Sequence, residues 1–197
     1  HSQCHIGTDT VSWAKLGARV TGLYFSPTAL DAARSIAERV GVDATFVETE
    51  LYDAPTHIEE QFDCVYTGVG AINWLPDIAE WGRVMAGFVK PGGTFYIRDG
   101  HPMLYALDDE RDDDAMVVVH PYFETTDPLK WESPVSYAGS ATLTNTTNYE
   151  WNHSLAEIVM ALIDAGLVID ELRELTHLDW PYFSLSLIHI SEPTRQP

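Results

Sequence analysis

The chain has few basic residues and few cysteines. Its 197 residues include 30 Asp and Glu but only 11 Lys and Arg, for a formal net charge of −19. Such a charge repels phosphate backbones and anionic lipid, so we expect neither nucleic acid nor a membrane as a partner. Cys4 and Cys64 are too few for a disulfide framework, which favours a reducing, cytoplasmic location. No apolar run approaches the ~20 residues that a bilayer-spanning helix needs.

The remaining composition is that of an ordinary globular protein, with 45% hydrophobic and 21% charged residues. This length suits one domain with a substantial core, which we assign to residues 1–184. His1 falls within what should be the end of a strand, so we expect the domain to be truncated at its N-terminus. Residues 185–197 resemble translated adaptor or vector sequence, and we interpret them as an artefactual tail.

Helix and strand patterns alternate along the first half of the chain. The apolar periodicity predicts helices over residues 8–16, 27–40 and 78–88, and strands over residues 20–25, 44–47, 62–67 and 94–98. Ser26 and Pro27 favour a helix start, and Gly17 and Gly41 favour helix ends. The Pro91–Gly93 step is expected to separate the third helix from the strand after it. Such alternation predicts an α/β fold, a mostly parallel sheet between two layers of helices.

Residues 99–149 depart from this rhythm. An acidic run over residues 108–114 and short β-prone pieces at 116–120 and 130–131 predict a small antiparallel flap inserted at about residues 104–149. Ser154 and Glu157 have the spacing of a capping box, which predicts a helix ending before Gly166. A strand is expected over residues 167–175.

Four stretches, in this order and at these spacings, resemble class I S-adenosylmethionine-dependent methyltransferases. They are QCHIGTDT from Gln3, VTGLYFSPTALDAAR from Val20, FDCVYTGVGAINWLPD from Phe62 with its downstream KPGG, and RDGHPML from Arg98. The chain is most similar to a small-molecule branch of that family. This resemblance implies a Rossmann-like sheet, S-adenosylmethionine as cofactor and a small-molecule methyl acceptor. The cofactor is expected across the carboxyl ends of the strands.

The resemblance also implies which residues border the cofactor. The expected set is Cys4, His5, Gly7, Tyr24, Phe25, Ser26, Glu50, Leu51, Thr67, Gly68 and Val69. The first loop is glycine-rich in the family, whereas Gln3 and His5 occupy two of its three glycine positions here. Because His5 adopts a positive φ less cheaply than glycine, we expect its backbone to pass beside the ligand with the imidazole turned away.

Tyr24 stands where the family has an acid that accepts hydrogen bonds from the ribose. A tyrosine hydroxyl offers no charged bidentate acceptor. Losing a charged partner costs about 1.5–3 kcal/mol, or one to two decades of affinity. Tyr24 therefore weakens the expected cofactor site.

Methyl transfer needs alignment and desolvation, and it needs a base only when the acceptor must lose a proton. His101 is the candidate base, because histidine titrates near neutrality, although orienting the flap or packing would also explain it. Tyr149, Trp151 and His153 lie where the flap returns and are expected to shape an aromatic acceptor pocket, with core packing as the alternative for Trp151. Trp74 is expected to line the same pocket or to pack under the sheet. Cys4 and His5 have no further ligands at zinc spacing, so we expect no metal.

Three functions remain open at this point. The leading hypothesis is methyl transfer to a small organic acceptor. A degenerate domain that binds cofactor weakly or not at all is the second, suggested by Tyr24 and the truncated first strand. A nicotinamide-dependent oxidoreductase is the third, and it is disfavoured because the first loop lacks GxGxxG.

Overall fold

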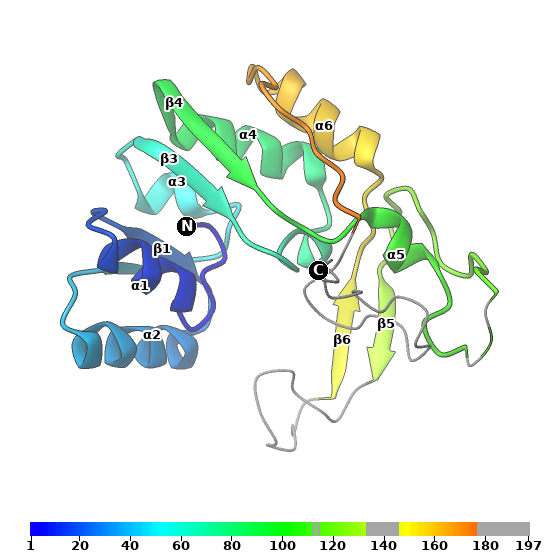
Figure 1. The fold of residues 1–197 in the computed structure, drawn as a ribbon, viewed down its shortest axis with the longest axis horizontal. Helices are drawn as coiled ribbons and strands as arrows, with labels where there is room; N and C mark the ends of the chain where they lie inside the picture. The colour runs from blue at the N-terminus through cyan, green and yellow to red at the C-terminus, as the bar shows by residue number, and fades with distance from the viewer. Residues whose placement is uncertain (112, 114, 133–145, 177–197) are drawn as a thin grey trace, which may run out of the picture.

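The computed structural model describes residues 1–111, 113, 115–132 and 146–176 (Figure 1). In chain order the helices and strands are α1 (Thr8–Lys15), β1 (Thr21–Tyr24), α2 (Pro27–Val40), β2 (Thr45–Glu48), α3 (Ala54–His57), β3 (Phe62–Thr67), a 3₁₀ helix η1 (Ile72–Trp74), α4 (Ile78–Phe88), β4 (Val89–Ile97), α5 (Pro102–Ala106), β5 (Leu129–Glu132), β6 (Thr147–Glu150) and α6 (Leu155–Asp164). The predicted α/β class is confirmed, and no helix among these elements is long and apolar enough to span a bilayer.

Two parallel strand pairs form the sheet, and the N-terminal residues join them. β1 pairs with β2, and β3 pairs with β4. Between the pairs, Cys4 N donates to Leu23 O at 2.8 Å, and Ser2 N donates to Tyr66 O at 2.9 Å. Ser2 also forms a parallel bridge with Thr67. Residues 1–4 therefore act as the end of a central strand, which brings all the carboxyl ends to one edge.

Helices lie on both sides of this sheet, with α1 and α2 on one side and α4 and α6 on the other (Figure 1). α2 has the predicted ends: Ser26 Oγ accepts from Ala29 N, and Gly41 is left-handed at φ 70°. Its buried face is Leu30, Ala33 and Ala37, whereas Val40 in the last turn is 42% exposed. The last turn of α2 thus extends beyond the sheet.

The core lies between the sheet and the pair α4–α6. Trp81 and Met85 of α4 are fully buried, and Ile158 and Leu162 of α6 belong to the same cluster. Gly82 allows the close approach, because a Cβ there would lie 2.5 Å from Ala161 O. This packing fixes the side of the sheet from which α6 and the segment before it reach the site.

β4 corrects one prediction, because it begins at Val89 and runs through Pro91–Gly93 instead of starting after them. A register shift opposite Phe62 and Cys64 absorbs the irregular residues. Gly92 takes φ 78°, and a Cβ on Gly93 would lie 3.0 Å from Asp63 O. The step is therefore an irregularity inside a strand rather than a break before one.

The strand predicted over residues 167–175 is wrong. Residues 167–174 carry no regular secondary structure, although Leu167 and Ile169 pack on the core. The apolar residues Val168 and Leu172 of this segment are 83% and 58% exposed. The segment therefore covers the core with some of its apolar residues and leaves the others in solvent, which produces an apolar pattern without a strand. The short helices α3 and α5, which each have proline in the first turn, were not predicted either.

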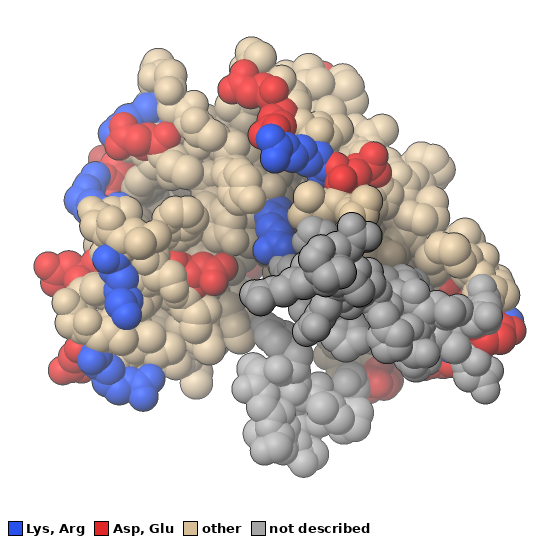
Figure 2. Space-filling model, in the orientation of Figure 1, with Lys and Arg blue, Asp and Glu red and all other residues tan. Residues whose placement is uncertain are grey.

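The insertion contains the predicted antiparallel pair. β5 and β6 pair with Leu129 opposite Glu150 and Trp131 opposite Asn148. Of the β-prone piece 116–120, only Val118 pairs, in an isolated bridge with Leu107. Residues 133–145, two residues of the acidic run (112 and 114) and the expected tail 185–197 lie outside the described residues. On the face in Figure 2, basic side chains stand among acidic ones.

Candidate functional site

The first loop holds a left-handed backbone at every position where glycine is expected. Gln3, His5 and Gly7 have φ of 52°, 50° and 74°. For Gln3 and His5 this conformation costs about 1–2 kcal/mol each, so the surrounding contacts must hold it. Gly7 N donates to Cys4 O at 2.8 Å, and Cys4 N is bound to β1. The loop therefore keeps its backbone shape without the usual glycines.

Gly7 is the one glycine that this loop cannot replace. A Cβ at Gly7 would lie 2.7 Å from Ala33 Cβ and 3.0 Å from Phe46. The loop thus passes directly against α2 and β2, with no room for a side chain. Cys4 fills the space below the loop: it is 4% exposed, and burial raises the pKa of its thiol to about 11. Its side chain packs in the core, as a wall rather than a ligand-facing group.

The aromatic groups at the end of β1 lie beside this loop. The Tyr24 ring is edge-on to the His5 imidazole, with centroids 5.5 Å apart, and it contacts the Phe25 ring at 4.6 Å. Phe25 is 54% exposed. The Ser26 hydroxyl is used by the α2 cap. Of the three predicted residues, Phe25 presents the largest free apolar surface.

The loop after β2 separates its two predicted residues. Leu51 is 5% exposed and belongs to the core cluster, so it does not offer a face to a ligand. Glu50 is exposed and follows Thr49, whose hydroxyl donates to Glu50 O at 3.0 Å. Glu50 is thus the accessible member of the pair.

The loop after β3 is held from two directions. Thr67 is fully buried, and its hydroxyl lies 2.7 Å from Ser2 Oγ. Gly68 is buried and Val69 is 40% exposed. Gly70 takes φ 71°, and its N donates to Asp99 Oδ1 at 2.8 Å. We name residues 3–7, 24–26, 49–51 and 67–70 the loop side of the site.

Asp99 was missed by the sequence reasoning. Its Oδ1 also accepts from Gly100 N at 2.7 Å, so it ties the loop after β3 to the end of β4. Burial raises the pKa of its carboxyl, and the amides of Gly70, Gly100 and Ile72 oppose that shift. The available signal was position, because Asp99 follows a parallel strand at the edge where ligands bind.

His101 caps α5 in this structure. Its Nδ1 accepts from Met103 N at 3.1 Å, and its Nε2 lies 2.9 Å from Glu174 Oε1. A ring whose Nδ1 accepts and whose Nε2 faces a carboxylate carries its proton on Nε2. To act as a base at Nδ1, His101 would have to release the α5 cap. Its catalytic role stays a prediction.

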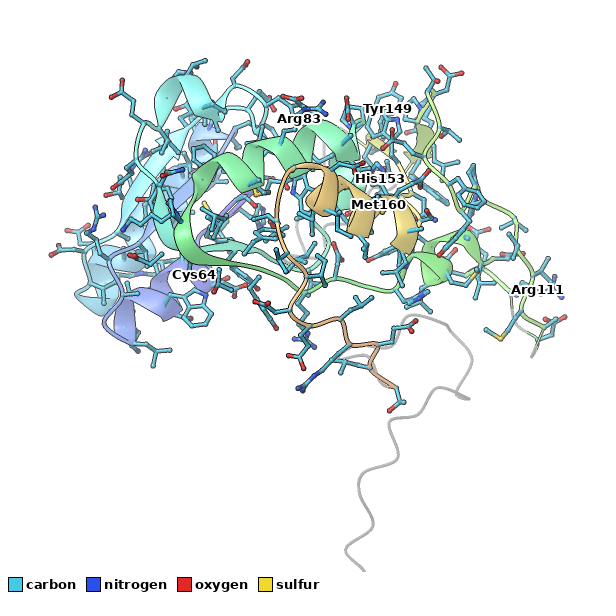
Figure 3. All side chains as sticks on the ribbon, turned by 90° about the horizontal axis from the view of Figure 1, so that it is seen from above. Cys64, Arg83, Arg111, Tyr149, His153 and Met160 are labelled. Carbon is cyan, nitrogen blue, oxygen red and sulfur yellow. The ribbon has the colours of Figure 1, made fainter. Side chains whose placement is uncertain are left out.

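The aromatic residues predicted for the acceptor pocket differ in exposure and in hydrogen-bond partners. Trp74 is 42% exposed, and its Nε1 donates to Gly70 O at 2.9 Å. Trp151 is partly buried, and its backbone N donates to Asn73 O. Tyr149 lies on β6 near the start of α6 (Figure 3) and is 50% exposed. Strand alternation puts Tyr149 on the face of the hairpin opposite Asn148 and Glu150.

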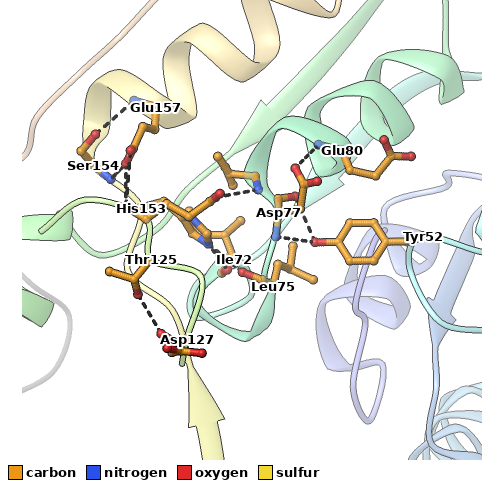
Figure 4. Close-up of polar contacts among 12 residues, drawn as sticks. Tyr52, Ile72, Leu75, Asp77, Glu80, Thr125, Asp127, His153, Ser154 and Glu157 are labelled. Atoms are coloured by element: carbon orange, nitrogen blue, oxygen red, sulfur yellow. Dashed lines mark hydrogen bonds and ion pairs between the residues drawn. The ribbon is translucent and has the colours of Figure 1, made fainter. Parts of the chain in front are cut away.

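Contacts of His153 and Glu124 hold the insertion against the helices (Figure 4). His153 is 2% exposed, and its Nδ1 lies 2.8 Å from Glu124 Oε2 while its Nε2 faces Leu75 O at 2.8 Å. Glu124 Oε2 also accepts from Ile78 N, and Glu124 N donates to Glu157. We name residues 99–111, 115–132 and 146–153 the insertion side. The sequence predicted one aromatic pocket shaped by Tyr149, Trp151 and His153. His153 is instead buried, where it contacts Glu124 and Leu75 O.

The predicted capping box is confirmed and belongs to the same network. Ser154 Oγ accepts from Glu157 N, and Glu157 accepts from Ser154 N at 2.7 Å. The structure therefore brings the loop side and the insertion side together at the carboxyl edge of the sheet. Within the described ranges, no group of three or more His, Cys, Asp or Glu side chains could hold a metal ion.

Comparison with known proteins assigns the domain. Residues 2–95 match the family model described as a methyltransferase domain. This half of the chain is therefore similar to a methyltransferase domain. The chain is 32% identical over 93 residues to a ubiquinone biosynthesis O-methyltransferase of Methylobacterium sp. (strain 4-46), a match that covers 47% of this chain and 36% of that protein.

Two further relatives extend beyond the matched half. The uncharacterized methyltransferase YbaJ of Bacillus subtilis (strain 168) is 28% identical over 159 residues, covering 79% of this chain and 60% of YbaJ. An S-adenosylmethionine-dependent methyltransferase structure from Clostridium acetobutylicum ATCC 824 superposes with a TM-score of 0.63 at 14% identity, covering 86% of this chain and 72% of that one. The structural likeness supports the Rossmann-like fold. The chain spans 36% of the length of the Methylobacterium protein and 60% of that of YbaJ.

Proposed function

We propose that this methyltransferase domain transfers a methyl group from S-adenosylmethionine to a small-molecule acceptor. The left-handed backbone at Gln3, His5 and Gly7 carries the proposal, because it keeps amide groups and a side-chain-free surface at the strand ends despite two lost glycines. The cofactor would supply a methyl group activated by a positively charged sulfur.

The loop side fits such a cofactor at most of its positions. His5 and Gly7 would approach it through their backbone, Phe25 would cover the adenosine, and Glu50 would accept from the adenine amino group. Thr67, Gly68 and Val69 would border its amino-acid end. Tyr24 is the poor fit, because its hydroxyl replaces a charged acceptor for the ribose.

The insertion side would hold the acceptor. Trp74 is the last residue of η1, which directly follows the loop after β3, and Trp151 N donates to Asn73 O in the same turn. Acceptor binding there would align the attacking atom with the methyl group and exclude water, which are the main contributions that this chemistry requires. A proton that the acceptor loses would go to a base such as His101, after its ring leaves the α5 cap.

Calorimetric titration with S-adenosylhomocysteine tests the proposal against its two alternatives. We expect saturable heat with a 1:1 stoichiometry. The absence of heat at millimolar ligand would favour the degenerate domain, for which Tyr24 is the motivating residue. Tight binding of NADH in place of S-adenosylhomocysteine would favour the oxidoreductase.

A further inference from the structure

A groove lies between α3 and α4, away from the candidate functional site. Its volume is about 370 Å³, and it is lined by residues between 55 and 60 and by residues of α4 between 80 and 88. The first of these segments leads into Phe62, where β3 begins, and the second ends one residue before Val89, where β4 begins. The groove is therefore at the amino ends of β3 and β4, whereas the candidate site is at their carboxyl ends.

The floor of this groove is apolar and includes a glycine. Ile58, Val84 and Phe88 line it and belong to the core cluster, with exposed fractions of 8%, 4% and 6%. A Cβ on Gly87 would meet nothing within 4 Å, so open space lies over that residue. Glycine destabilises a helix relative to alanine, and its lack of a side chain here leaves the groove unfilled. The volume falls in the range of small-molecule pockets, roughly 300–1,000 Å³.

The rim of the groove carries three carboxylates and one guanidinium group. Arg83 of α4 (Figure 3) pairs with Glu80 at 2.6 Å, and Arg19, from outside the groove, pairs with Glu60 at 3.0 Å. Glu59 is exposed and has no ion pair or hydrogen bond with any residue that the structure describes. It is thus the carboxylate whose charge is not balanced. A cleft with apolar walls and charge of one sign concentrates ions of the opposite sign.

Charge and volume together select the kind of ligand. One unpaired carboxylate is too few for calcium or magnesium, which take six or more oxygen ligands. A protein partner would need roughly 800 Å² of surface on each side, whereas this groove has the size of a small-molecule pocket. An ammonium group offers three donors and no acceptor, which suits a carboxylate, and an attached apolar body would cover the floor.

We propose that this groove binds a small organic amine, with its ammonium group at Glu59 and its apolar body over Gly87. The inference goes beyond the proposed function, because the groove lies at the opposite edge of the sheet from the residues assigned to the cofactor and the acceptor. It gives the domain a second ligand site, selective for cations.

Three indole compounds of similar size test the proposal on the unchanged protein. Tryptamine is cationic, tryptophol neutral and indole-3-propionate anionic at neutral pH. In titrations followed by amide NMR, we expect tryptamine to shift the amides of residues 58–60 and 84–88. It should bind about threefold more tightly than tryptophol, and indole-3-propionate should bind most weakly. Equal affinities, no binding at millimolar concentration, or shifts confined to the carboxyl edge would each overturn the proposal.

Saturating S-adenosylhomocysteine separates this proposal from the proposed function. The affinity for tryptamine should be the same with and without it, because the two sites are at opposite edges of the sheet. Competition between the two ligands would show that tryptamine occupies the cofactor site, and would overturn the second site alone.

Two variants locate the ammonium group and the apolar body. Glu59→Gln keeps the shape and removes the charge, so tryptamine should bind no more tightly than tryptophol. Gly87→Leu fills the open space with a better helix former and should weaken both about tenfold. Glu38→Gln is the matched control, an exposed carboxylate on α2 across the sheet, and should change neither affinity. An undiminished preference for tryptamine in Glu59→Gln would overturn the proposal, and this variant decides if Gly87→Leu does not fold.

Discussion

Backbone geometry holds the loop side, whereas side chains distant in sequence hold the insertion side. In the first loop, left-handed residues and main-chain hydrogen bonds to β1 fix the shape. Within the insertion side, Glu124 contacts the buried His153, and Asn152 Nδ2 donates to Pro102 O and Pro121 O at 3.0 Å each. We therefore expect the loop side to tolerate changes of side chain that leave its backbone conformation intact. We expect the insertion side to be sensitive to the loss of individual side chains.

The variant Gly7→Ala should break the loop side most severely. It adds a Cβ 2.7 Å from Ala33 at φ 74°, so we expect a loss of about 3 kcal/mol in the free energy of unfolding, from overpacking and backbone strain together. Urea denaturation followed by circular dichroism measures it. Gly17→Ala is the control, since Gly17 has φ 95° but no heavy atom within 4 Å of the added Cβ. The control should lose only the strain of about 1–2 kcal/mol, and a control loss as large as that of Gly7→Ala would mean that strain alone explains Gly7.

Glu124→Ala should break the insertion side. It leaves His153 Nδ1 and Ile78 N without their carboxylate, so we expect a loss of about 2–3 kcal/mol in the same urea assay. Affinity for S-adenosylhomocysteine should change little, because the loop side is held independently. Arg83→Ala removes an exposed pair with Glu80 and should cost less than about 1 kcal/mol. A Glu124→Ala loss no larger than this would contradict the fastening role.

Tyr24→Asp should strengthen cofactor binding by the loop side. The new carboxylate restores a charged acceptor for the ribose, and we expect S-adenosylhomocysteine to bind at least tenfold more tightly, or about 1.4 kcal/mol. Calorimetry measures the change. Tyr24→Asn separates charge from the removal of the ring and should gain less. Unchanged affinity in Tyr24→Asp would mean that the ribose is held elsewhere.

The two thiols should differ in their reactivity toward an alkylating reagent, which requires no substitution. Cys4 is buried under the first loop, and burial raises its pKa to about 11, whereas Cys64 is exposed on β3. At pH 8 the buried thiol stays protonated and inaccessible. Iodoacetamide should therefore modify one thiol in the native protein and two in urea, as counted by mass spectrometry. Rapid modification of Cys4 in the native protein would show that the first loop opens.

Much of the loop side could be predicted from sequence because its signals are local. The Ser26–Pro27 start and Gly41 end of α2 and the bounds of β3, which carry its loops, depend on residues within a few positions of one another. Pro91–Gly93 misled the prediction because a register shift, which depends on the partner strand, keeps it inside β4. The left-handed φ at His5 is likewise imposed by its surroundings rather than by its own preference.

The insertion side could not be predicted in the same way. The Glu124–His153 pair joins residues 29 positions apart, and His153 Nε2 faces Leu75 O, 78 positions away. No periodicity encodes such contacts. Tyr149 and His153 were grouped by proximity in sequence, yet one is half exposed and the other is buried. Asp99 had a usable positional signal, but its role depends on Gly70, which only the folded chain brings near.

Glu157 connects the first turn of α6 to the insertion. Its carboxylate accepts both Ser154 N, which closes the helix start, and Glu124 N, which belongs to the insertion. Fraying of that turn would therefore release the insertion in the same event, so the two form one cooperative opening unit in the sense of amide hydrogen exchange. The amides of Glu124 and Ser154 should then exchange at a common rate, set by the helix rather than by the flap.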